Sequence, residues 1–394
     1  MAIHKRKLNK SLVWFSVLFS VSLVVPLVGQ AAVLYLEPEN GQYYQGDTFI
    51  INLKVNTEGE EINTVEGNLK FSRDLLKFID FIKGDSILSL WVQEPAYFKE
   101  EGKISFLGGI PDGFRGDGKI LSIVLQTISL GEAKISFQDI SKVLLNDGKG
   151  TPAQLSFSEG NYQITERPKE LPEIFSRSHP DQNKWYQNKT LHLHWDLIEG
   201  TEYSFLLSYN PLAEPDEIPD RPEGELIWMG DIEYANLEDG IYYFTLKQKL
   251  PDQNWSKTAT FRAMIDATSP EDFKPEIAKI EGKNYLVFTT IDKTSGIDHY
   301  EAKELSRIFP KNNKKEWKLA TSPYLLENQS LRTIIKIKAV DKAGNEKISE
   351  IAPPFKITWK DIIISLVILI VIAVIWLIIQ RFKKKRKIIE IGPR

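Results

Sequence analysis

A two-residue alternation of apolar and polar side chains recurs along most of this chain, and it restricts the possible folds more than any other feature. Apolar side chains occupy every second position at Phe49, Ile51 and Leu53, and again at Leu69 and Phe71. A period of two places every second side chain on one face of a β-strand. Between the two ends of the chain, amphipathic helical periodicity never extends beyond about two turns. We therefore predict an all-β protein built from three tandem β-sandwich domains.

The C-terminal part departs from this pattern. Residues 362 to 379 form a run in which all but Ser365, Ala373 and Trp376 are Ile, Leu or Val. As a helix, the run would extend about 27 Å, which is close to the ~30 Å hydrocarbon thickness of a bilayer. Because it has no polar face, we predict one transmembrane helix over residues 361 to 380. Residues 381 to 394 form a basic tail, which predicts a cytoplasmic C-terminus.

Residues 1 to 31 have the organisation of a secretory signal peptide. Basic residues such as Lys5 and Arg6 precede an apolar stretch, and the small residues Gly29 and Ala31 suit cleavage after Ala31. An uncleaved signal anchor is the alternative, but the apolar stretch is short for a bilayer span. We therefore expect a single-pass protein of the cell membrane whose N-terminal domains are extracellular.

Charge and cysteine content exclude several kinds of function. Residues 33 to 380 carry 39 basic and 52 acidic side chains, so their net charge is −13. This charge argues against binding of nucleic acid or an anionic polymer, and it is compatible with a neutral glycan, a divalent cation or a protein partner. The chain contains no cysteine, which excludes disulfides, Cys-ligated metal centres and thiol catalysis.

Two charged stretches that contain proline, residues 166 to 173 and residues 267 to 275, have the composition of linkers. They separate three segments, namely residues 33 to 165, residues 174 to 266 and residues 276 to 358. We expect each segment to form its own β-sandwich.

The second and third segments end in the same way. In each, a strand leads into an Asx-rich turn and then into a last strand. The turn is Pro251-Asp252-Gln253-Asn254-Trp255-Ser256 in the second segment and Asp341-Lys342-Ala343-Gly344-Asn345-Glu346 in the third. The Asp-x-Ala-Gly-Asn pattern of the third segment is similar to the end of fibronectin-type-III and bacterial immunoglobulin-like domains. This resemblance implies that both segments are spacers.

The first segment contains five stretches whose order and spacing point to one family. They are Gln45-Gly46-Asp47-Thr48, residues 65 to 76, Gly102-Lys103-Ile104-Ser105-Phe106, residues 118 to 125 and Gly160-Asn161-Tyr162-Gln163-Ile164. Together they resemble a cohesin domain, a jelly-roll-like β-sandwich related to cellulose-binding modules. One departure is Phe71-Ser72-Arg73, which replaces the Tyr-Asp-Pro-like corner of the family.

The cohesin resemblance implies recognition without catalysis, because cohesins bind dockerin modules and relatives of the fold bind polysaccharide. An Asn-x-Asp pair contacts dockerin in the family. Thr64 and Glu66 occupy these positions here, so only the acid is retained. Independently, strand alternation places Thr64, Glu66, Asn68 and Lys70 on one face. On a protein-binding face, Glu66 and Lys70 would be steering charges and Asn68 a hydrogen-bonding centre; a solvated strand face without a partner is the alternative.

Tryptophan offers a second type of binding site, because an aromatic ring can stack on the apolar face of a sugar. We expect Trp91 to be the exposed candidate, since it precedes a polar stretch, Val92-Gln93-Glu94-Pro95, that would lie between strands. Trp185, Trp228 and Trp255 have the same chemistry, although core packing explains most tryptophans of a sandwich.

No catalytic motif or nucleotide fingerprint occurs, and loop acids such as Asp112 and Asp147 lack EF-hand spacing, so we assign no catalytic residue, cofactor or metal. We expect a membrane-anchored cell-surface protein, not an enzyme, whose cohesin-like module recognises a polysaccharide or a dockerin-like module. Such a protein could take part in polysaccharide-degrading assemblies. The alternative is a structural surface-layer or adhesion protein whose sandwiches pack against copies of themselves.

Overall fold

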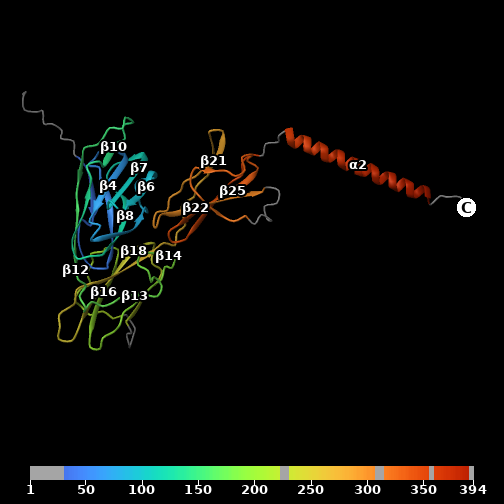
Figure 1. Ribbon diagram of the computed structural model, residues 1–394. Coiled ribbons are helices and arrows are strands. Elements are labelled where there is room, and N and C mark those ends of the chain that lie inside the picture. Colours follow the sequence, from blue (N-terminus) through green and yellow to red (C-terminus); the bar gives the residue numbers. More distant parts are fainter. Residues whose placement is uncertain (1–30, 222–229, 307–314, 355–358, 390–394) are drawn as a thin grey trace, which may run out of the picture. The chain divides into compact units, whose positions relative to one another are not determined.

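The computed structural model describes residues 31–221, 230–306, 315–354 and 359–389, and for residues 360, 361 and 384–389 it describes the backbone alone. Within these residues the chain is all-β apart from one long C-terminal helix, which confirms the predicted fold class (Figure 1). Contacts divide the chain into two compact units, the first of which comprises Met1–Glu271, Ile291–Asp298 and Asp341–Asn345. Nearly all of the predicted signal peptide lies outside the described residues.

The first unit begins with a five-stranded sheet in the order β11-β1-β3-β8-β5. Its middle strands follow the alternation of the sequence, since Ile51 and Leu53 of β3 point into the main core whereas Ile50 belongs to a separate apolar cluster on the other face. The strands are β1 (Ala32–Glu37), β3 (Thr48–Asn56), β5 (Leu76–Ile82), β8 (Asp117–Thr127) and β11 (Leu155–Phe157).

A seven-stranded sheet packs against the first one, in the order β2-β12-β9-β4-β7-β6, with β10 also paired to β4. All its pairs are antiparallel except β2 with β12. The strands are β2 (Asn40–Tyr44), β4 (Ile62–Phe71), β6 (Leu90–Phe98), β7 (Lys103–Phe114), β9 (Gly131–Phe137), β10 (Lys142–Leu145) and β12 (Gly160–Thr165).

The core between these two sheets is apolar and closely packed. Phe49 stacks on Tyr43 with ring centroids 4.0 Å apart, and Tyr162 lies against both rings. On the inner face of β4, Gly67 leaves room for the ring of Phe106, because a Cβ atom at this position would lie 2.2 Å from that ring. The residues that the sequence predicts to be buried, such as Leu69, are buried here.

The outer face of the five-stranded sheet is also covered. Ile50, Ile82 and Val124 form an apolar cluster with Trp185 and Met264, which come from the next part of the first unit. All five are at least nine-tenths buried. One outer face of this sandwich is therefore an internal interface of the unit.

The remainder of the first unit contains a three-stranded sheet, β13-β15-β17, and a four-stranded sheet, β14-β19-β18-β16. Between them, Trp195 packs with Phe205 and Phe244. The strands are β13 (Phe175–Ser176), β14 (Trp185–Tyr186), β15 (Leu191–His194), β16 (Glu202–Ser208), β17 (Asp231–Tyr234), β18 (Gly240–Lys249) and β19 (Ala259–Ile265).

The second unit has a smaller core, in which Leu286, Phe288 and Ile335 are buried between two further sheets. The sheets have the orders β20-β21-β24 and β23-β22-β25-β26. The strands are β20 (Glu276–Ile280), β21 (Lys283–Val287), β22 (Ile297–Ser306), β23 (Lys318–Ala320), β24 (Tyr324–Leu325), β25 (Thr333–Asp341) and β26 (Glu346–Ile351). The division of the chain into domains at residues 33 to 165, 174 to 266 and 276 to 358 stays a prediction.

The C-terminal helix α2 (Trp359–Ile389) contains the predicted apolar run. An 18-residue window within Ile362–Lys383 has a mean hydropathy of 3.6, and none of that window is buried against the rest of the described chain. By length and composition, the helix could cross a membrane. The end of the predicted basic tail, residues 390–394, lies outside the described residues.

Candidate functional site

The outer face of the seven-stranded sheet is the candidate site, and β4 lies at its centre. Val65, Leu69 and Phe71 of this strand belong to the core. The intervening residues Thr64 and Glu66 are half-buried on the opposite face, and Lys70 is exposed there. The structure thus places these three predicted residues on one surface, as strand alternation requires.

Asn68 departs from this expectation. Its neighbour in the sheet changes at this point, because β9 pairs with Leu69–Phe71 whereas β10 pairs with Ile62–Glu66. The connection between β9 and β10 fills the gap, and Ser141 both accepts a hydrogen bond from Asn68 N (3.0 Å) and donates one to Asn68 O (3.1 Å). Asn68 is therefore 4% exposed and is not the accessible hydrogen-bonding centre that the sequence predicts.

Apolar residues adjoin the charged residues of β4, and the sequence analysis missed them. Glu66 pairs with Leu107 of β7, which in turn pairs with Gln93 of β6. Directly paired residues share a face of a sheet. Leu90 of β6 pairs with Gly109, and Phe98 pairs with Lys103, so both side chains lie on the same face as Glu66. Leu90 is 54% exposed and Phe98 is 43% exposed, which makes this face partly apolar.

The sequence did not reveal Leu90 and Phe98 as outward residues, because the pairing of β6 with β7 is irregular. The register of β6 shifts between Trp91 and Gln93 and again between Gln93 and Ala96. Each β-bulge inserts residues that change the alternation, so the outward residues of β6 do not follow a period of two. The bulges coincide with the polar stretch at 92–95 that the sequence suggested to be a segment between strands.

Trp91 is correspondingly not a loop residue. It lies within β6, is half-buried and packs edge-on against the buried ring of Phe106, with centroids 6.0 Å apart. Lys83 Nζ lies 5.8 Å from its ring. The indole thus packs on the core side of the sheet edge, opposite Leu90, and the expected freely exposed sugar-stacking tryptophan is not found at this position.

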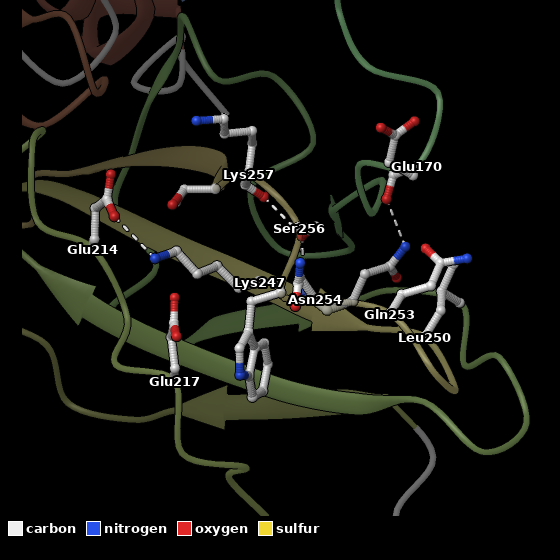
Figure 2. Close-up of a pocket in the computed structure, with 12 residues that line it drawn as sticks. Glu170, Glu214, Glu217, Lys247, Leu250, Gln253, Asn254, Ser256 and Lys257 are labelled. Carbon is white, nitrogen blue, oxygen red and sulfur yellow. Dashed lines mark hydrogen bonds and ion pairs between the residues drawn. The ribbon is translucent and has the colours of Figure 1, made fainter.

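The other tryptophans that were singled out differ in their surroundings. Trp185 is buried in the apolar cluster described above, and Trp228 lies outside the described residues. Trp255 lines a cavity of about 500 Å³ beside the β18–β19 connection (Figure 2). Glu214 and Glu217 lie on one side of this cavity and Glu170 on the other.

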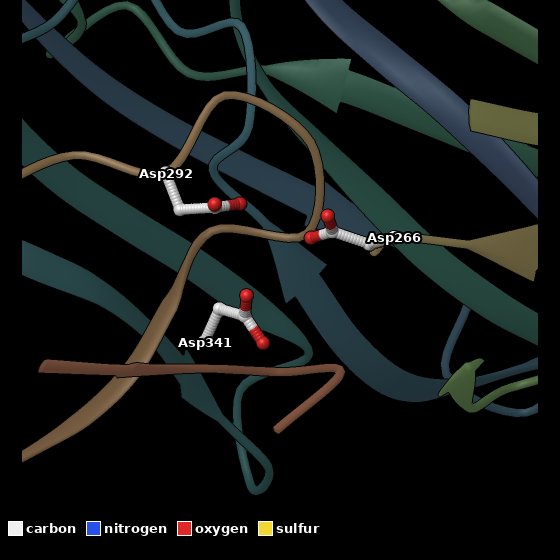
Figure 3. Close-up of side chains that lie close together, drawn as sticks. All are labelled: Asp266, Asp292 and Asp341. Carbon is white, nitrogen blue, oxygen red and sulfur yellow. The ribbon is translucent and has the colours of Figure 1, made fainter. Parts of the chain in front are cut away.

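Three buried carboxylates form a second cluster that the sequence analysis did not identify (Figure 3). Asp266 follows β19, Asp292 precedes β22 and Asp341 ends β25, and their carboxylate oxygens lie within 4.8 Å of one another. Asp341 begins the Asp-x-Ala-Gly-Asn turn, which was the only sequence signal for this place. The three oxygens have the spacing of ligands that could hold a divalent cation.

Burial controls the electrostatics of these carboxylates. Loss of solvent raises the pKa of Asp266, of Asp292 and of Asp341, and repulsion between neighbouring carboxylates adds to the increase. Backbone N–H groups oppose it; Gly296 N, for example, donates to Asp292 Oδ1 at 2.9 Å. Lys342 does not neutralise the cluster, since its ammonium group contacts Asp80 and the carbonyl of Phe81.

No protein-family model and no curated protein matches the sequence. Among solved structures, the chain is similar to cohesin domains. A type I cohesin–dockerin complex from Clostridium thermocellum matches with 17% identity over 35% of this chain and 95% of that chain, with a TM-score of 0.31. A non-cellulosomal cohesin from Archaeoglobus fulgidus matches with 14% identity over 35% and 93% of the two chains, with a TM-score of 0.30.

The cohesin module of a family 33 glycoside hydrolase from Clostridium perfringens matches with 10% identity over 35% of this chain and 97% of that chain, with a TM-score of 0.27. These similarities concern the fold of about a third of the chain. The solved structures that match this third of the chain are thus cohesins, the family that its sequence stretches resemble.

Proposed function

We propose that this chain is a non-catalytic binding protein whose cohesin-like domain recognises a dockerin-like module of a partner protein. The proposed contact surface is the outer face of β4, β7 and β6. We further propose that α2 anchors the chain in the cell membrane, with the β-domains outside and the basic tail inside.

The observation that carries the proposal is the contrast between the two outer faces of the sandwich. The face of the five-stranded sheet is covered by Trp185 and Met264. The face of the seven-stranded sheet presents two exposed apolar side chains, Leu90 toward its Thr64 end and Phe98 toward its Lys70 end. Exposed apolar side chains among polar residues are typical of a protein-binding surface. Because Glu66 and Lys70 give this face both signs of charge, it suits a protein partner better than an ionic polymer.

A binding titration with purified type I dockerin modules tests the proposal on the full chain in detergent micelles. We expect at least one module to bind, and we expect Leu90→Glu and Phe98→Glu each to weaken binding by about tenfold or more, because each places a charge in a desolvated apolar contact. Both side chains are exposed in the free protein, so the substitutions leave the core intact.

Leu319→Glu is the matched control, since Leu319 is 76% exposed and belongs to the second unit. Wild-type affinity for a dockerin in both β6 variants would refute the proposed face. Absence of binding to every dockerin would refute the partner class. Self-association that Leu90→Glu abolishes would favour the structural alternative instead. Trp91→Ala is a poor probe, because Trp91 supports the core through Phe106.

A further inference from the structure

We propose that the cavity beside Trp255 is a separate binding site for a neutral saccharide. The site belongs to the second part of the first unit and shares no residue with the dockerin-binding face proposed above. The inference is therefore independent of that proposal.

The cavity is built by a connection that folds back on its own strand. After β18, the chain turns at Leu250, whose carbonyl accepts a hydrogen bond from Gln253 N at 3.1 Å. Ser256 then pairs with Gln248: its N–H donates to Gln248 O at 2.8 Å, and its Oγ accepts from Gln248 N at 3.1 Å. These bonds fix the backbone on both sides of Trp255, so the indole is held at the cavity wall.

A second chain segment closes the opposite wall. Gln248 is 5% exposed, and its side-chain Nε2 donates to the carbonyl of Glu170 at 2.6 Å. The proline-bearing stretch before β13, which the sequence identifies as a linker, thus forms part of the site. A cavity of about 500 Å³ is within the range of about 300–1,000 Å³ that is usual for small-ligand sites.

The lining combines an aromatic surface with polar groups of both kinds. Trp255 supplies an apolar ring that can stack on the C–H face of a pyranose. Gln253 and Asn254 are exposed at the cavity, and each side-chain amide can donate and accept hydrogen bonds. A hydroxyl group also does both, so this combination suits a polyhydroxylated ligand.

A buried oxygen in the lining lacks a partner. Thr258 Oγ1 is inaccessible to solvent and forms no hydrogen bond with any part of the chain that the structure describes. Buried hydroxyl groups are normally satisfied, and an exception needs an explanation. Because the oxygen is closed off from the cavity in this structure, a ligand hydroxyl could reach it only if the side chain of Thr258 turned toward the cavity.

The charges of the lining restrict the ligand further. Lys247 is bound to Glu214 with Nζ and Oε2 2.9 Å apart, so its charge is already compensated. Glu170 and Glu217 outnumber the remaining cation, Lys257. The site therefore disfavours phosphates and acidic sugars and leaves neutral sugars as the matching class.

Isothermal titration of the full chain tests the inference. The micelles must have no sugar headgroup, so an amine-oxide detergent is suitable. The probes are cellohexaose, xylohexaose and mannohexaose, with oligogalacturonate as the anionic and spermine as the cationic comparison. We expect at least one neutral oligosaccharide to bind, and we expect Trp255→Ala to weaken that binding about tenfold or more because the stacking surface is lost.

Trp317→Ala is the matched control. Trp317 is also half-buried and has Lys338 Nζ 5.0 Å from its ring, much as Trp255 has Lys249 Nζ at 5.9 Å, but it does not line the cavity. We expect the affinity of Trp317→Ala for the neutral oligosaccharide to stay within about twofold of wild type. Should Trp255→Ala fail to fold, as judged by its thermal unfolding, the exposed pair Gln253→Ala and Asn254→Ala replaces it with the same expected loss.

Three results would overturn the inference. They are no binding of any neutral oligosaccharide by the folded wild-type chain, unchanged binding by the Trp255 or amide variants, and tighter binding of oligogalacturonate or spermine than of every neutral probe. None of these results would alter the outcome of the dockerin titration, so the two proposals fail separately.

Discussion

Gly67 determines how closely the ring of Phe106 can approach the inner face of β4. A methyl group at position 67 would meet that ring, which is itself 1% exposed. We predict that Gly67→Ala lowers the free energy of unfolding by about 1–3 kcal/mol, as other overpacked cores do. Thermal and denaturant unfolding of the full chain measure this change.

Gly109→Ala is the control for this substitution. Gly109 lies in the neighbouring strand β7, and a Cβ atom there would be 3.8 Å or more from any neighbour. We expect its unfolding midpoint to match wild type within error. Equal destabilisation by both variants would show that the loss arises from the glycine backbone and not from the Phe106 ring.

Asp292 links stability to pH. Its pKa is raised above the ordinary value of 3.8 by burial and by the neighbouring carboxylates. At a pH between 3.8 and the raised pKa, the folded state holds a proton that the unfolded chain has released. The free energy of unfolding therefore decreases as the pH rises through this window. Asp292→Asn removes the titrating group while its amide oxygen can still accept the N–H of Gly296.

We predict that Asp292→Asn flattens the pH dependence of the melting temperature above pH 3.8 and raises stability at neutral pH. Melting curves of the full chain at a series of pH values measure both effects. Asp74→Asn is the control, because Asp74 is exposed and does not belong to the cluster. A slope as steep in Asp292→Asn as in wild type would assign the pH dependence to other groups.

At the scale of elements, the β9–β10 connection completes the sheet beside β4. Ser141 is 4% exposed, and its hydroxyl accepts the hydrogen bond of Asn68 N, whereas Asn68 O also accepts one from Gln138 N at 2.8 Å. We predict that Ser141→Ala destabilises the protein by about 1–3 kcal/mol, because it leaves the buried Asn68 N without this acceptor. Unfolding in denaturant measures the loss.

Ser156→Ala provides the comparison, since Ser156 is exposed on the edge strand β11. It should unfold at the wild-type denaturant concentration. If Ser141→Ala did so as well, water would have to replace the hydroxyl group, and the connection would be less closed than the structure shows.

Regular alternation made the inner face of β4 predictable, and irregularity hid the rest. Leu69 and Phe71 were assigned to the core because each local rule agrees with the fold there. The bulges of β6 change the period at Trp91 and Gln93, so the sequence predicted an exposed Trp91 before a segment between strands and missed Leu90. The burial of Asn68 depends on a connection 73 residues away, which periodicity cannot reveal.

At the scale of the whole molecule, the two ends and the alternation between them predicted the class of fold. The cluster of Asp266, Asp292 and Asp341 could not be predicted, because its members come from three connections that only the folded chain brings together. The covered outer face of the five-stranded sheet was hidden for the same reason, since Ile50 and Met264 are distant in sequence.

The proposed topology predicts the outcome of proteolysis on intact cells that express the chain. A protease added outside should remove epitopes placed within residues 33 to 355 and spare one placed after Lys387, because α2 has the length and composition to separate them. Immunoblots of the two epitopes measure this difference, and permeabilised cells serve as the control. Protection of the large segment in intact cells would invert the scheme.

The pairing of β12 has a mechanical consequence. This strand is the last of the first β-sandwich and lies between two neighbours, parallel to β2 over residues 161 to 165 and antiparallel to β9 over residues 160 to 164. A tension applied along the chain from the side of the proposed anchor would pull β12 lengthwise between them. Its inter-strand hydrogen bonds would then be loaded together, in shear, and would not open one after another. A tether that enters through such a strand can hold a bound load without peeling the sheet apart from its edge.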